Sequence, residues 1–105
     1  MAIGTTDINT ITKAKVNNQL KEPNLFKVIY ENDNKTTMEF VVESLMTVFF
    51  HTREGSEAIT MEIHETGSSV VAVLPHELAE QKGLEVTTMA RGQGFPLQVK
   101  IEEEV

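Results

Sequence analysis

The sequence predicts a small α+β sandwich in which a three-stranded sheet packs against three helices, in the element order β-α-α-β-α-β. The chain has 105 residues, enough for one hydrophobic core and too few for two. Hydrophobic residues make up 40% of it and charged residues 24%, which is the mixture of a folded globular domain. Short β-favouring runs alternate with segments whose apolar residues recur at helical spacing. Such mixed connections favour an antiparallel or mixed sheet with the helices on one face.

The N-terminal stretch lacks the patterns of a folded element. Residues 1–23 are rich in Thr, Asn and Lys, carry isolated aliphatic residues and show no strong helical stripe before Pro23. We therefore predict a flexible arm over residues 1–23 and a folded domain over residues 24–105.

The domain is predicted to begin with a strand and a helix. Residues 25–30 form a β-favouring run that ends in an Asn-Asp-Asn sequence, whose side chains favour turns. Thr36 is followed three residues later by Glu39, the pattern of a capping box. Apolar residues then continue at helical spacing, which predicts a helix of about three turns.

A second helix and a second strand follow. Thr52 or Ser56 can cap the helix, and Gly67 can end it in the left-handed conformation. The continuous apolar run over residues 70–74, which ends at Pro75, is typical of a central strand in the core.

The last two elements are a third helix and a third strand. Pro75 and Glu77 suit the first turn of a helix, and Gly92 lies beyond its end. Gly83 inside this helix costs about 1 kcal/mol relative to alanine. Residues 97–101 alternate apolar and polar side chains, as a half-buried strand does, and an acidic tail follows.

Charge and cysteine content exclude several function classes. The chain has 9 basic and 16 acidic residues and a formal charge of -7, which disfavours a nucleic-acid surface. With no cysteine it can form no disulfide, thiolate nucleophile or cysteine-based zinc site. It has no apolar run as long as a membrane span and no secretory signal pattern. We expect a soluble cytoplasmic protein that binds neither nucleic acid nor membrane.

Three histidines are the candidate catalytic bases or metal ligands. His51, His64 and His76 lie 12 to 13 residues apart, and none has a partner at a metal-ligand spacing such as that of HExxH. The sequence therefore predicts no catalytic residue, metal or cofactor. A hydrolase or metal site built on His64 is kept as a minor hypothesis.

Residues 30–40 read YENDNKTTMEF, and this run resembles the strand-to-helix junction of the ClpS family of Clp protease adaptors. The family motif runs Asn-Asp-Asp, two residues, then Pro or a similar residue before Met-Glu-Phe-Val. Four further segments resemble the family in order and at matching spacings: residues 27–29, residues 62–64 followed by Gly67, residues 77–82 and residues 95–97. The resemblance covers residues 23–104. It implies a fold like the C-terminal domain of the ribosomal stalk protein.

The resemblance implies a site for the α-ammonium group of a substrate's first residue. Asn32 and His64 would accept hydrogen bonds from the ammonium, and Asp33 would lie beside the peptide backbone that follows. Asn34 stands where the family usually has a second acid, so it offers a carbonyl without a charge. A hydrophobic pocket for the first side chain would be formed by Thr36, Met38, Val41, Thr60, Ile63 and Leu97.

Two pocket positions affect specificity in this resemblance. Met38 would screen out β-branched first residues, because its thioether crowds the Cβ branch. Thr60 stands where relatives commonly have a longer Met, so the floor of the pocket differs in shape. Helical and strand spacing alone would also bury Val41, Ile63 and Leu97 in the core.

The implied function is that of a non-enzymatic adaptor, with no cofactor, that holds proteins by a bulky N-terminal Leu, Phe, Tyr or Trp, the N-end rule. It would deliver these N-degron substrates to a Clp ATPase for degradation. Glu77 and Lys82 match positions that hold the N-terminal domain of ClpA in the family, so the resemblance implies the N-terminal domain of ClpA or ClpC as the partner. We expect a monomer. The alternative, motivated by Asn34 and Thr60, is a domain of the same fold that docks on an ATPase without recognising N-terminal residues.

Overall fold

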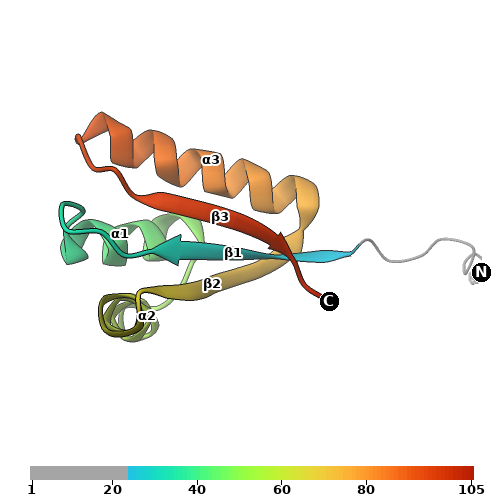
Figure 1. Ribbon diagram of the computed structural model, residues 1–105, viewed down its shortest axis with the longest axis horizontal. Coiled ribbons are helices and arrows are strands. Elements are labelled where there is room, and N and C mark those ends of the chain that lie inside the picture. Colours follow the sequence, from blue (N-terminus) through green and yellow to red (C-terminus); the bar gives the residue numbers. More distant parts are fainter. Residues whose placement is uncertain (1–23) are drawn as a thin grey trace, which may run out of the picture.

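The computed structural model describes residues 24–105, and it confirms the predicted α+β fold. The predicted arm over residues 1–23 lies outside the described residues. Three helices pack against a three-stranded sheet, with α1 lying behind β1 and α3 running beside β3 (Figure 1). The elements are β1 (Leu25–Glu31), α1 (Met38–Val48), α2 (Arg53–Thr66), β2 (Ser68–Pro75), α3 (His76–Gly92) and β3 (Gln98–Glu103).

The sheet has the strand order β2-β1-β3, and both outer strands are antiparallel to β1. The prediction that residues 70–74 form a central strand is therefore wrong, because β1 is central and β2 lies at an edge. Val71 is buried in the core, while Val70 and Val73 are 43% and 39% exposed. An apolar run shows that a strand has few polar positions, but it does not show how many partners the strand has.

Threonine side chains cap the first two helices. The hydroxyl of Thr37, not of Thr36, accepts the hydrogen bond from the Phe40 N–H at the start of α1. The predicted cap was one residue too early, because the Thr36 hydroxyl donates to Asp33 instead. Thr52 caps α2, as one of the two predicted options had it.

A close approach explains the glycine in the middle of α3. Gly83 is buried against β3, and a Cβ atom at this position would lie 3.4 Å from Ile101 Cδ1 and 3.6 Å from Val99 Cγ1. The cost of glycine in a helix is thus offset by tight packing of α3 on the sheet.

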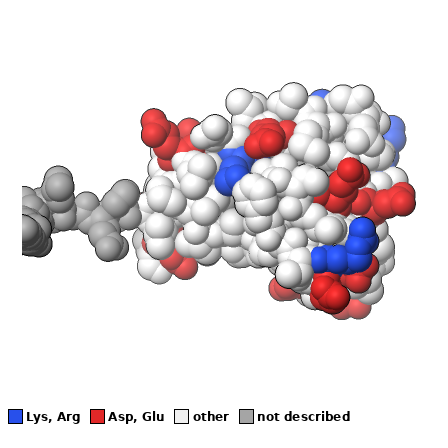
Figure 2. Space-filling model, turned by 180° about the vertical axis from the view of Figure 1, so that it is seen from behind, with Lys and Arg blue, Asp and Glu red and all other residues white. Residues whose placement is uncertain are grey.

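One hydrophobic core lies between the sheet and the helices. Its polar member is Tyr30, whose fully buried hydroxyl lies 2.7 Å from Ser44 Oγ, while that Oγ donates to the Val41 carbonyl. The side of the molecule opposite to that in Figure 1 carries both acidic and basic groups, with uncharged surface between them (Figure 2). The buried hydrophobic residues are Val28, Tyr30, Phe40, Val41, Leu45, Val48, Ile63, Val71, Ala79, Val86, Ala90 and Leu97.

The helices of the described part of the chain have 11, 14 and 17 residues and are amphipathic. Over residues 24–105, none of them has the length and apolar character that a membrane crossing requires.

Candidate functional site

The loop between β1 and α1 is organised by one carboxylate. Asp33 Oδ1 accepts hydrogen bonds from the backbone N–H of Lys35 at 2.8 Å and of Thr36 at 2.7 Å. Its other oxygen, Oδ2, accepts from the Thr36 hydroxyl at 2.8 Å. These bonds close a turn immediately before α1 and fix the direction in which the loop enters the helix.

The same contacts keep Asp33 ionised. Partial burial alone would raise the pKa of its carboxyl. The hydrogen bonds from Thr36 and Lys35, with the positive charge of Arg91, outweigh that effect and hold the pKa below its ordinary value. The loop therefore carries a fixed negative charge at neutral pH.

Gly67 joins this loop to the end of α2. The Asn32 N–H donates to the Gly67 carbonyl at 2.9 Å, and the Gly67 N–H donates to the Ile63 carbonyl at 2.9 Å. Gly67 has a φ of 100°, the left-handed conformation that ends α2. The predicted ligand residues Asn32 and His64 are thus brought to one region, the junction of the loop with the last turn of α2, and both are exposed.

Substitution of Gly67 by alanine should destabilise the fold and distort this junction. Nothing lies within 4 Å of a Cβ placed at Gly67, so the penalty is backbone strain at a φ of 100°, about 1 to 2 kcal/mol. Chemical denaturation should show this loss. Gly92→Ala is the matched control, because Gly92 also has open space around it but lacks the positive φ, and its stability should change little. Equal stability of the two variants would contradict this account of the junction.

The predicted pocket residues fall into two groups. Val41, Ile63 and Leu97 come from three different segments and share the core cluster, with exposures of 6%, 4% and 1%. Thr60 is also buried, and its hydroxyl donates to the Ser56 carbonyl at 2.7 Å. Met38, by contrast, is 42% exposed at the start of α1. The apolar set is therefore together in space, with Met38 at its solvent edge.

The Leu97 segment is held in place by α3. Arg91 Nη1 donates to the carbonyls of Phe95 at 3.0 Å and Leu97 at 2.9 Å. The Phe95 ring packs edge-on against Phe40 of α1 at a centroid distance of 5.4 Å. These contacts fix Leu97 next to the first helix.

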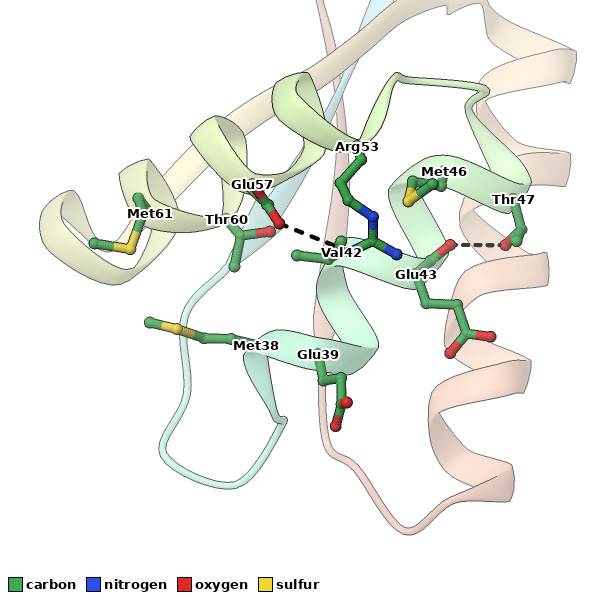
Figure 3. A pocket seen from close by; sticks show the side chains of 10 residues that line it. All are labelled: Met38, Glu39, Val42, Glu43, Met46, Thr47, Arg53, Glu57, Thr60 and Met61. Carbon is green, nitrogen blue, oxygen red and sulfur yellow. Dashed lines mark hydrogen bonds and ion pairs between the residues drawn. The ribbon is translucent and has the colours of Figure 1, made fainter.

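A cavity of about 680 Å³ lies between α1 and α2, and we call it the α1–α2 groove. It contains two predicted pocket residues, Met38 and Thr60, at one end (Figure 3). Leu97 is not among its lining residues. The other lining residues were missed by the sequence analysis: Glu39, Val42, Glu43, Met46, Thr47, Arg53, Glu57 and Met61.

A sequence signal for the groove existed. Met38, Val42 and Met46 recur every four residues, which places them on one stripe of α1. The same spacing also marks the core face of α1, which hides the second stripe.

The predicted docking residues, Glu77 and Lys82, lie on α3 in different environments. Glu77 is exposed in the first turn. The Lys82 ammonium donates to the Val48 carbonyl at 2.8 Å and lies 5.0 Å from the ring centroid of Phe50. Lys82 thus also ties α3 to the end of α1 by capping an unpaired carbonyl.

The histidines are dispersed. His51 Nε2 lies 2.7 Å from the Val71 carbonyl, and His76 pairs with Glu80 at 3.0 Å. Among residues 24–105, no group of three His, Cys, Asp or Glu side chains is arranged to hold a metal ion. The described geometry therefore gives the minor metal hypothesis no support.

Comparison with known proteins identifies the family. The model of the family described as ATP-dependent Clp protease adaptor protein ClpS matches residues 21–100. The chain belongs to the ClpS family. A ClpS adapter from Campylobacter jejuni strain 81-176 is 42% identical over 86 residues, which cover 82% of this chain and 90% of the relative. A ClpS adapter from Acetivibrio thermocellus is 41% identical over 95 residues, 90% of this chain and 96% of the relative.

A solved ClpS structure confirms the fold of this family member. The structure of Agrobacterium tumefaciens ClpS2 bound to L-phenylalaninamide matches with a TM-score of 0.77 and 37% identity. The match covers 79% of this chain and all of the other. This chain therefore shares the architecture of a ClpS protein that was captured with an amino-acid amide.

Proposed function

We propose that this ClpS-family adaptor binds proteins that begin with a bulky hydrophobic residue, Leu, Phe, Tyr or Trp, and delivers them to a Clp ATPase for degradation. The observation that carries the proposal is the Asn32–Gly67 hydrogen bond, which sets Asn32 beside the turn of α2 that bears His64. The relative bound to L-phenylalaninamide supports it, since that compound presents a free α-amino group and a phenyl side chain.

The polar half of the site suits an ammonium group. An ammonium has three N–H donors and no acceptor, so it needs neutral or anionic acceptors around it. Asn32 offers an amide carbonyl and His64 a ring nitrogen, both at the surface. Asn34, exposed in the same loop, offers a further carbonyl.

Asp33 has a different role in this proposal. A carboxylate has about four lone-pair sites, and three of them are used by Thr36 and Lys35. The one that remains can accept the backbone N–H of the second substrate residue. The fixed charge of Asp33 also attracts the ammonium.

The apolar half holds the first side chain. Burying a Leu- or Phe-sized side chain contributes about 1.5 to 3 kcal/mol. Val41, Ile63 and Leu97 are buried, so a ligand reaches them only if an exposed side chain above them moves. In this proposal Met38 is that side chain: its flexible thioether moves aside, and the substrate side chain enters beneath it. Thr36 completes the wall of the pocket and Thr60 its floor.

Other parts of the chain deliver the bound substrate to the Clp ATPase in this proposal. The surface of α3 with Glu77 and Lys82 docks on the N-terminal domain of ClpA or ClpC, and the exposure of Glu77 supports this. Residues 1–23 act as a separate arm that engages the ATPase during handover, while residues 24–105 hold the substrate. The adaptor acts as a monomer in the cytoplasm and performs no catalysis.

One observation favours the alternative, an ATPase-docking domain without N-terminal recognition. The cavity is lined by Met38 and Thr60 but not by Leu97, so it reaches one edge of the predicted pocket and does not extend to its Leu97 side. The two proposals differ in whether Met38 opens for a ligand, and peptide binding distinguishes them.

The loop contacts of Asp33 should persist as the pH falls through the ordinary titration range of an aspartate. Because its pKa is lowered, the stability that these contacts contribute is present at and above that range and is lost only in stronger acid.

Isothermal titration calorimetry with a peptide that begins with phenylalanine tests the role of His64. The variant His64→Gln keeps an uncharged acceptor and should retain more of the affinity than His64→Ala, which keeps none. Equal losses in the two variants would remove His64 from the proposed role.

A further inference from the structure

The α1–α2 groove continues away from the proposed N-terminal site along the two helices. Met38 and Thr60 lie at the end nearest that site, and Met46 and Arg53 lie at the far end (Figure 3). The eight-residue step from Met38 to Met46 spans about 12 Å of helix. An extended chain covers this distance with roughly three to four residues.

The groove combines an apolar floor with an acidic rim. Met38, Val42, Met46 and Met61 supply flexible or aliphatic surface. The charged lining residues are Glu39, Glu43, Glu57 and Arg53, which sum to a charge of -2.

The basic residue of the groove, Arg53, already forms an ion pair with Glu57. Arg53 Nη1 lies 3.7 Å from Glu57 Oε2, as the dashed line in Figure 3 marks. Glu39 and Glu43 lie one turn apart on α1, and both are exposed. They are the carboxylates left to meet a ligand's charge.

We propose that the α1–α2 groove binds the side chain of an Arg or Lys among the second to fourth residues of the substrate. This inference rests on the proposed function and deepens it, because it names the sequence that should follow the hydrophobic first residue. The groove is continuous with the N-terminal site through Met38 and Thr60. A substrate leaving that site therefore reaches the groove within a residue or two.

Long basic side chains fit both features of the groove. Their methylene stems pack on apolar surface while the cationic head stays at the edge. Packed along Val42 and Met46, such a stem brings its head to Glu39 and Glu43 on the rim. An acidic side chain in the same place would meet like charges, and alanine would gain neither contact.

Fluorescence anisotropy with three peptide series tests the inference. Each peptide begins with phenylalanine and carries Arg, Ala or Glu in turn at positions two, three and four, with alanine elsewhere in this segment. At low salt, Arg at one or more of these positions should bind about three- to tenfold tighter than Ala, and Glu weaker than Ala. The differences should shrink as ionic strength rises.

The double variant Glu39→Gln/Glu43→Gln should abolish the Arg preference and leave the affinity for the alanine peptide unchanged, which also shows that the variant is folded. Glu85→Gln/Glu102→Gln is the matched control, because it removes the same charge from exposed positions on α3 and β3. It should keep the preference.

The outcomes distinguish failure of this inference from failure of the proposed function. Equal affinities of the Arg, Ala and Glu peptides, or an Arg preference that survives in the Glu39/Glu43 variant, would overturn the inference while the proposed function stands. Loss of the preference in both double variants would also overturn it, since the net charge and not the groove would then be responsible. Failure of the alanine peptide to bind at all would instead refute the proposed function, and the inference with it.

Discussion

Replacement of either Asn32 or His64 by alanine is expected to weaken binding of a peptide with N-terminal phenylalanine by roughly ten- to a hundredfold. Each substitution removes one acceptor for a charged donor, and hydrogen bonds to charged groups contribute about 1.5 to 3 kcal/mol. Both side chains are exposed, so their removal should leave the fold intact. Isothermal titration calorimetry gives the affinities, and thermal unfolding verifies stability.

The structure offers a matched control for the histidine. His76 is exposed on α3, where it pairs with Glu80, and His76→Ala should bind the peptide with parental affinity. Binding by the Asn32 and His64 variants within twofold of the parent would show that the junction of the loop with α2 does not hold the ammonium.

Replacement of Met38 by alanine should change which N-terminal residues are accepted. In the parent protein we expect peptides that begin with valine or isoleucine to bind poorly, because the Met38 thioether crowds a branch at Cβ. The shorter side chain should raise their affinity about tenfold or more relative to the phenylalanine peptide. Anisotropy competition with the three peptides measures this ratio.

Met61→Ala is the control for the methionine substitution. Met61 is 45% exposed and lines the same groove from α2, but it was not assigned to the N-terminal pocket. It should leave the discrimination against valine unchanged. If Met38→Ala still rejects valine, Met38 does not set the specificity.

The elements of the fold could be predicted because each has a local signal. The N-cap of α1 could not be chosen in this way, because the adjacent Thr36 and Thr37 are equally good caps in isolation. The choice is made by Asp33, which takes the Thr36 hydroxyl and leaves Thr37 to cap α1. The packing reason for Gly83 was likewise invisible, because it depends on the distance between α3 and β3.

The order of strands and the shape of the cavity depend on long-range packing. Hydrophobicity placed residues 70–74 in the core, but pairing put β1 between its two neighbours. For the site, a resemblance of short motifs selected Asn32 and His64, and the contact between Asn32 and Gly67 explains their proximity. The groove could not be predicted, because it depends on the relative position of α1 and α2, which residue spacing within each helix does not give.

The most direct test of the central claim compares one peptide with and without a free N-terminus. A fluorescent peptide beginning with phenylalanine is titrated with the full chain, and the same peptide is then used with its α-amino group acetylated. Acetylation removes the positive charge and two of the three N–H donors while keeping the phenyl ring. We predict that binding of the free peptide saturates and that acetylation weakens it more than about 100-fold. Equal binding of the two peptides would contradict recognition of the N-terminal residue and leave the ATPase-docking alternative.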